Sequence, residues 1–216
     1  MAKLRLNGDT SGYMDIQPPA IADNSTLDLS SVVTSANAGT LIPIRAGEVI
    51  ETFASLCDGS SVTVGSGTYT TTNVTAVQAM GAAYADVTGS AITYTPPSDA
   101  SRVIYEFSFM VSTTGAHDIG SFRFYIDGVE ATDARVSTGG QSYVELGRMS
   151  FKWIVNIGSA NASTGAQATW TAGKEMKIQA RAYSTGNDPK LHGTYYFDGA
   201  VSQQFSRPLL TITAIK

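Results

Sequence analysis

The chain has 216 residues, with 14 basic and 18 acidic side chains and a net charge of −4. Charged residues make up only 15% and form no basic cluster, which argues against a phosphate-contacting groove and a nucleic-acid partner. The single cysteine, Cys57, excludes an intrachain disulfide framework and a zinc site built from thiolates of this chain alone. The 21 glycines and the many Ser and Thr residues favour strands and turns over helices, so we expect an all-β chain.

The first twelve residues, "MAKLRLNGDTSG", lack the apolar stretch of a signal peptide. No later segment approaches the ~18 consecutive apolar residues of a membrane span. We therefore expect a protein that is made and folded in a cytoplasm and does not insert into a membrane.

Residues 1–46 read as a short β-rich N-terminal arm with three brief alternating segments. Each segment supplies only two inward aliphatic residues, which is too few for an independent core. The arm therefore needs another surface: the main sheet, a neighbouring copy or a larger assembly, of which we favour the last two. The anchoring residues are Leu4, Leu6, Met14, Ile16, Leu27 and Leu29.

Residues 47–216 read as one antiparallel two-sheet β-sandwich, because about twelve strand-like segments alternate with Gly, Ser, Asn and Asp turns. A strand is also expected within "TYTTTNVTAVQAM", where only the alanines argue for a helix. Five alternating residues after a double-proline corner predict the inward face of a long central strand. These residues are Val103, Tyr105, Phe107, Phe109 and Val111.

Turns and loops are also marked in the sequence. Asp127-Gly128 predicts a tight hairpin whose central residues have positive φ. The polar segments 159–173 and 184–190 predict exposed loops. Cys57 is expected to be a small buried residue of a strand.

No residue pattern points to catalysis or to a cofactor. His117-Asp118 has no third ligand at a defined spacing, and His192 is far away in sequence. A calcium site using Asp127 and Asp198 is conceivable, but Asp-Gly in a hairpin needs no ion to explain it. Carboxylate pairs for polysaccharide hydrolysis cannot be identified from spacing. We expect a protein that is not an enzyme and binds no metal.

Two interaction surfaces are predicted. An aromatic run and a closing strand with apolar residues on both faces imply a second buried surface near the C-terminus, where a second copy is the simplest partner. The predicted interface residues are Tyr195, Tyr196, Phe197, Leu210 and Ile212. Exposed loops also offer a glycan or receptor contact, with Trp170 as a stacking residue. The contact residues would be Trp170, Asn161 and Asn187.

Short motifs along most of the chain resemble those of a viral family. "MAKLRLNGDTSG" followed by "IADNSTLDLSS" is similar to an N-terminal repeat of structural and tail-fibre proteins of tailed bacteriophages, notably marine and cyanobacterial ones. "YADVTGSAITYTPPSDASRVIYEFSFMV" and the closing "RPLLTITAIK" resemble their C-terminal jelly-roll module. Two features depart from the family: "LSSVV" replaces the usual Leu-Pro, and no collagen-like or coiled-coil shaft is present, so a long fibre is not expected.

The resemblance implies a jelly-roll head similar to the trimeric C1q and tumour-necrosis-factor class. It implies a homotrimer on a virion surface: a capsid decoration or head-fibre protein, or a short tail fibre. The arm would bind the major capsid protein or other virion proteins. The alternative from a different class is a carbohydrate-binding module that contacts a host-surface glycan.

Overall fold

The computed structural model describes residues 4–7, 13–16, 45–113, 119–138, 145–184, 189–195 and 203–216. These residues form strands, turns and no helix. Every pair of strands among them is antiparallel. The expected all-β, jelly-roll-like antiparallel sandwich is therefore confirmed. The chain divides into residues 1–43 and residues 44–216, and each unit is described by itself.

The first unit contains one described hairpin. Strand β1 (Leu4–Asn7) pairs with β2 (Tyr13–Ile16). Leu4 lies opposite Ile16, and Leu6 lies opposite Met14, so these four predicted anchoring positions occupy two rows of the hairpin. Leu27 and Leu29 lie outside the described residues.

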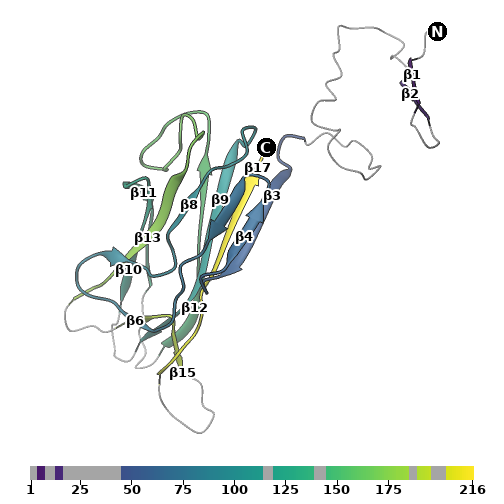
Figure 1. The fold of residues 1–216 in the computed structure, drawn as a ribbon. Helices are drawn as coiled ribbons and strands as arrows, with labels where there is room; N and C mark the ends of the chain where they lie inside the picture. The colour runs from purple at the N-terminus through teal and green to yellow at the C-terminus, as the bar shows by residue number, and fades with distance from the viewer. Residues whose placement is uncertain are drawn as a thin grey trace. The chain divides into compact units, whose positions relative to one another are not determined.

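The second unit, the head, contains two sheets that face each other (Figure 1). The first, the β9 sheet, has the order β3-β17-β9-β12, and β14 continues along β9 with β6 beside it. Its strands are β3 (Val49–Leu56), β6 (Gln78–Ala79), β9 (Arg102–Thr113), β12 (Glu145–Asn156), β14 (Lys190–Leu191) and β17 (Leu209–Ile215).

The second sheet, the β10 sheet, has the order β11-β10-β13, and the far edge of β13 pairs with β7 and β8. Its strands are β7 (Ala85–Asp86), β8 (Ile92–Tyr94), β10 (Gly120–Ile126), β11 (Val129–Thr138) and β13 (Lys174–Ala182). Two small pairs complete the head: β4 (Ser61–Val64) with β5 (Gly67–Thr70), and β15 (Gly193–Tyr195) with β16 (Gln203–Phe205).

The core lies between the two sheets and is rich in aromatic rings. All five residues predicted for the inward face of β9 are buried, which confirms that prediction. From β10, Phe122 and Phe124 point into the same core. The Tyr105 and Phe124 rings are 4.9 Å apart between centroids, and those of Phe109 and Phe122 are 5.7 Å apart. Rings from both sheets therefore interlock across the sandwich.

The predicted Asp127-Gly128 hairpin is confirmed. It joins β10 to β11, and φ is 52° at Asp127 and 80° at Gly128. Both residues lie in the left-handed region, which matches the right-handed twist of the flanking strands.

The head begins and ends at the same place. The Gly47 main-chain N–H donates to the Lys216 carbonyl (2.6 Å), and the Lys216 N–H donates to the Glu48 carbonyl (3.0 Å). The last strand therefore closes directly against the point where the head starts.

Candidate functional site

The outer surfaces of the two sheets differ in character. On the β9 sheet, the outward residues of β3 and β17 carry no charge, whereas the adjoining part of β9 carries outward charges at Arg102 and Glu106. We call this surface the uncharged face. It consists of Thr52, Ala54, Leu56, Ile104, Leu209, Thr211, Thr213 and Ile215.

Strand register places the uncharged face in rows. Leu56 lies opposite Leu209, and Ala54 lies opposite Thr211. In the next row the Thr52 hydroxyl donates to Thr213 Oγ1 at 3.0 Å. Leu56 remains 51% exposed. The face is therefore a pleated surface of methyl groups and mutually bonded hydroxyls.

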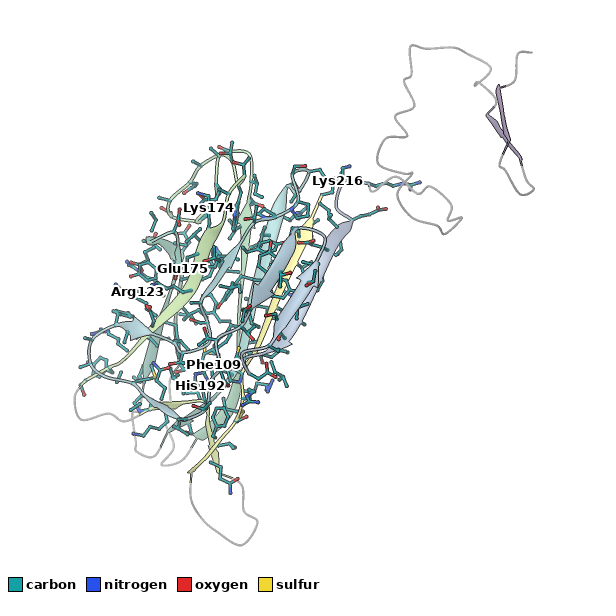
Figure 2. The ribbon with its side chains drawn as sticks, viewed as in Figure 1. Phe109, Arg123, Lys174, Glu175, His192 and Lys216 are labelled. Carbon is teal, nitrogen blue, oxygen red and sulfur yellow. The ribbon has the colours of Figure 1, made fainter. Side chains whose placement is uncertain are left out.

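The outer surface of the β10 sheet is instead densely charged. Arg123 and Glu175 lie on this side of the head (Figure 2). Glu130 of β11 contacts Arg135 at 2.6 Å and Arg123 at 3.4 Å. The hydrogen bond from Arg135 is the largest effect on Glu130 and lowers its pKa. We call this surface the charged face.

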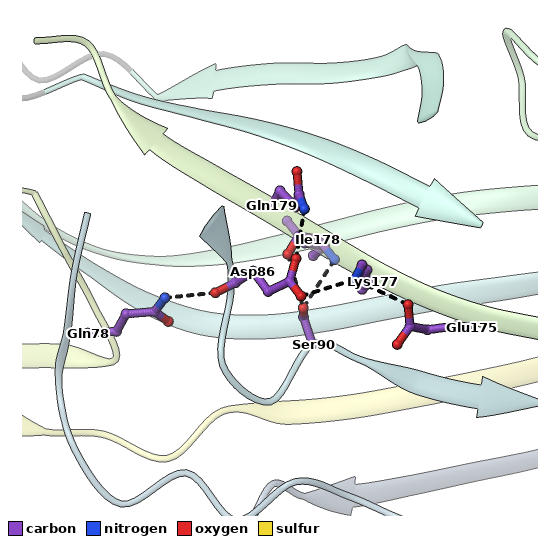
Figure 3. A network of polar contacts seen from close by, with 7 residues as sticks. All are labelled: Gln78, Asp86, Ser90, Glu175, Lys177, Ile178 and Gln179. Carbon is purple, nitrogen blue, oxygen red and sulfur yellow. Dashed lines mark hydrogen bonds and ion pairs between the residues drawn. The ribbon is translucent and has the colours of Figure 1, made fainter. Parts of the chain in front are cut away.

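Lys177 and Asp86 form the centre of the charged face (Figure 3). Lys177 Nζ is 3.0 Å from Asp86 Oδ2 and 3.2 Å from Glu175 Oε2, and Gln179 Nε2 donates to Asp86 Oδ1 at 2.8 Å. Partial burial acts to raise the pKa of Asp86, but the hydrogen bonds from Gln179 and Lys177 outweigh the effect of burial. The pKa of Asp86 is therefore lowered. The bonds to Asp86 and Glu175 raise the pKa of Lys177. The charged groups of Asp86, Glu175 and Lys177 are therefore paired with one another.

An aromatic ring extends the charged face toward β7. The Arg123 guanidinium lies 3.8 Å from the Tyr84 ring centroid, and that of Arg181 lies 5.3 Å from it. Both contacts fall within the range of cation–π attraction. The charged face is therefore a hydrated, internally paired surface, whereas the uncharged face has the composition of an interface core, where charged residues are depleted.

The structure corrects part of the predicted C-terminal interface. Leu210 and Ile212 are 0% and 1% exposed and belong to the core of their own chain, so their side chains are not available to a second copy. The outward apolar residues of the same strand are Leu209 and Ile215. Tyr195 belongs to β15, but its side chain is not described, and Tyr196 and Phe197 lie outside the described residues.

The structure also corrects the predicted glycan contacts. Trp170 is only 4% exposed, and its indole N–H donates to the Tyr94 carbonyl at 2.9 Å, so the ring cannot stack on a sugar. Asn161 is exposed, but its Oδ1 accepts from the Ser163 main-chain N–H at 3.0 Å and shapes its own loop. Asn187 lies outside the described residues.

A polar cluster that sequence reasoning missed surrounds Glu51 of β3. One carboxylate oxygen accepts from the Tyr94 hydroxyl at 2.6 Å and from the Ser66 hydroxyl, and the other accepts from the Ser66 main-chain N–H at 3.0 Å. Burial is the main reason that the Tyr94 pKa is raised. The cluster fastens the β4–β5 hairpin to the sandwich, and only three-dimensional proximity reveals it.

A second missed residue is His192. It is fully buried, has φ 62°, and lies beside Phe109, with 6.0 Å between ring centroids (Figure 2). Neither ring nitrogen makes a hydrogen bond of normal geometry among the described residues. Burial lowers the His192 pKa to about 4, against a smaller opposite effect of the Thr88 main chain. The predicted His117-Asp118 pair lies outside the described residues.

Two further observations concern the described residues alone. They contain no group of three His, Cys, Asp or Glu side chains that could hold a metal ion. In the same part of the chain, no helix is both long enough and apolar enough to cross a membrane.

Comparisons with known proteins identify no family. No family model matches the chain, and no curated protein matches its sequence. Dimeric latent PorU from Porphyromonas gingivalis shares 9% identity with a TM-score of 0.34, over 82% of this chain and 14% of that chain. Chains of infectious bursal disease virus share 9% (Gx strain) and 10% (Gt strain) identity, with TM-scores of 0.37 and 0.35.

Those two matches cover 97% of this chain and 44% and 46% of the viral chains. The chain thus spans less than half the length of each of these three solved chains. With every TM-score below 0.5, none of the three likenesses informs the function.

Proposed function

We propose that the chain is a bacteriophage virion structural protein, displayed on the particle surface as a homotrimer. It serves as a capsid decoration or head-fibre protein, or as a short tail fibre, and its N-terminal arm, residues 1–46, attaches it to the particle. The observation that carries this proposal is the uncharged face on β3 and β17.

A second copy of the chain is the partner that fits the uncharged face. Interface cores are depleted in charge, and a closed cyclic assembly covers the same patch on every subunit, whereas an open one leaves it exposed. In this arrangement Leu209 and Ile215 take the interface role that the sequence assigned to Leu210 and Ile212. The charged face stays in water.

The arm supports the attachment role. Its described hairpin has strands of four residues, and a hairpin of that size is marginally stable in water without a further surface. The N-terminal motifs resemble those of phage structural proteins, as do the corner before β9 and the closing strand. The arm is therefore assigned to the major capsid protein or another virion protein.

The role proposed here is structural and not catalytic. The carboxylate network around Glu51 holds the β4–β5 hairpin through two hydrogen bonds from Ser66 and joins it to β8 through a third from Tyr94. A glycan-binding role lacks its predicted stacking residue, because Trp170 is a core residue. Turnover on a panel of polysaccharides would contradict the structural role.

The trimer is tested by sedimentation velocity of the full chain at matched concentrations. We expect a trimeric wild type and a monomeric Thr213→Arg variant, because Thr213 lies between Thr52 and Ile104 and the arginine would place an unpaired charge in the interface. Ser121→Arg, which adds the same charge to an outward position of β10, should remain trimeric. A monomeric wild type, or a trimeric Thr213→Arg variant, would remove this interface from the proposal. Reconstruction of intact particles with and without the chain then tests its position on the virion.

A further inference from the structure

Charge pairing on the charged face is incomplete at one end. Arg123, Arg135 and Arg181 come from the three neighbouring strands β10, β11 and β13, and the first two contact the same Glu130 oxygen. Among the described residues, Arg181 forms no ion pair. Its buried Nε atom, like that of Arg123, has no hydrogen-bond partner there. Three guanidinium groups thus share one carboxylate, in a chain whose net charge is −4.

Strand register brings two of these arginines to the same tyrosine ring. Arg181 lies opposite Ser121 of β10, and Arg123 follows two residues later on the same side of β10. Tyr84 comes directly before β7, the strand that pairs with the other edge of β13. Its ring centroid lies 3.8 Å from the Arg123 guanidinium and 5.3 Å from that of Arg181. The ring holds both cations by cation–π attraction but carries no charge to neutralise them.

An exposed aromatic ring and two hydroxyl groups lie beside Arg181. Tyr183 follows two residues later on the same side of the chain, and its N–H donates to the Ile119 carbonyl at 2.9 Å, so the pairing with the β10 strand continues past the end of β13. Tyr183 is 65% exposed, more than any other large apolar side chain of the described residues. On the same surface the hydroxyls of Ser121 and Ser137 are hydrogen-bonded to each other at 3.1 Å. Such a ring can cover the apolar face of a sugar while polar groups bond its edge.

We propose that this part of the charged face binds an anionic sugar unit of an acidic polysaccharide. We call the site the arginine corner; it consists of Tyr84, Ser121, Arg123, Arg181 and Tyr183. Arg181 pairs with the carboxylate or sulfate group of the sugar, because a planar guanidinium donates two parallel hydrogen bonds to such a group. Tyr183 stacks on the sugar ring, and Arg123 adds positive charge. The arginine corner lies on the other sheet from the uncharged face, so its ligand does not compete with the proposed trimer contact.

An acidic sugar fits the arginine corner better than a nucleic acid does. The positive charge covers a small area, because Glu130 borders it on one side and Asp86, paired with Lys177, borders it on the other. A DNA duplex carries one phosphate charge per ~1.7 Å of helix axis and needs a longer row of cations. An acidic polysaccharide instead presents separate charges between neutral ring faces. That pattern matches one arginine without an ion pair beside one exposed tyrosine.

Titration calorimetry of the full chain with short oligosaccharides tests the proposal. One acidic probe is a galacturonic acid oligomer, and its neutral counterpart is the methyl ester of the same oligomer. The other acidic probe is a sulfated dextran oligomer, and its counterpart is unmodified dextran. We expect the wild type to bind at least one acidic probe, and to bind the neutral counterpart at least about tenfold more weakly, because the charge-assisted hydrogen bonds to Arg181 are lost.

Four variants assign the binding to the arginine corner. Arg181→Gln should weaken binding of the acidic probe at least about tenfold, and Tyr183→Ser should weaken it about fivefold. Arg148→Gln is the matched control, because it removes the same charge from an exposed position of β12, and it should bind as the wild type does. Ser121→Glu places a carboxylate opposite Arg181, so it should abolish binding without lowering the Tm. This variant separates loss of the site from loss of the fold.

Three results would overturn the proposal. The first is a wild type that binds neither acidic probe. The second is an equal loss of affinity in Arg181→Gln and Arg148→Gln, which would indicate general attraction between charges and no defined site. The third is equal affinity for a poly-glutamate peptide of similar length, or unchanged affinity in Tyr183→Ser, since either would show that the sugar ring is not recognised.

Discussion

The Trp170 indole N–H donates to the Tyr94 carbonyl at 2.9 Å, and the two rings meet edge to face with 6.4 Å between their centroids. A residue in the middle of a polar loop thus anchors that loop to β8.

Replacing Trp170 by Ala should therefore act on stability. Removing a buried Trp ring leaves a cavity and typically costs about 3–5 kcal/mol of unfolding free energy. Urea denaturation followed by near-ultraviolet circular dichroism measures the loss. A glycan array that binds the wild type and loses binding in this variant at full stability would contradict the structural role of Trp170.

His192 should make the stability of the head depend on pH. Its folded-state pKa, about 4, lies below the ordinary value of 6.5, so protonation favours the unfolded chain. The stabilisation is complete above pH 6.5 and declines as the pH falls toward 4, by about 3 kcal/mol in total. His192→Asn removes the titration and tolerates the positive φ. Its unfolding free energy should lose this part of the pH dependence, and an unchanged slope would contradict this role of His192.

Two glycines with similar φ should respond differently to alanine. At Gly89 (φ 87°) a Cβ would lie 2.6 Å from Val74 Cγ2 and 3.3 Å from Cys57 Cβ, so both strain and overlap oppose the change. We expect Gly89→Ala to cost about 2–4 kcal/mol. At Gly128 (φ 80°) no atom lies within 4 Å, and the cost should be about 1 kcal/mol. Equal denaturation midpoints for the two variants would contradict the contacts around Gly89.

Cys57 should be unreactive in the folded protein. Burial, with a smaller effect of the Asp58 charge, raises the pKa of its thiol to about 12, and the thiol group contacts the Gly89 carbonyl at 3.5 Å. Because the thiolate is the reactive form, labelling with a chromogenic disulfide reagent at mildly alkaline pH should be slow in buffer and rapid in denaturing urea. Rapid labelling of the native protein would show that the site opens readily.

Alternation and turn chemistry allowed much of the head to be predicted from the sequence. The inward face of β9 and the Asp127-Gly128 turn follow from local rules, and Cys57 is buried as expected. The segment 68–80 shows where strand prediction from local sequence fails. It contains β6 and most of β5 with irregular chain between them, because contacts such as that of the buried Val74 outweigh strand propensity.

The residues of the interaction sites were harder to predict from the sequence, for a physical reason. Alternation shows that Leu210 and Ile212 share one face of β17, but when both faces are apolar it does not tell which face meets the core. Trp170 is surrounded in sequence by small polar residues, so nothing nearby signals its burial. The Glu51 cluster joins three segments that only the fold brings together.

The hydrogen bonds between Gly47 and Lys216 and between Lys216 and Glu48 have a consequence for protein engineering. A short flexible linker could join the two ends of the head, and the chain could be reopened in the exposed loop at residues 159–163. Circular permutants with new ends in such loops are generally tolerated. In that permutant, a peptide fused to the new terminus would emerge beside Trp153 of β12. It would lie at the opposite edge of the β9 sheet from β3, the first strand of the head.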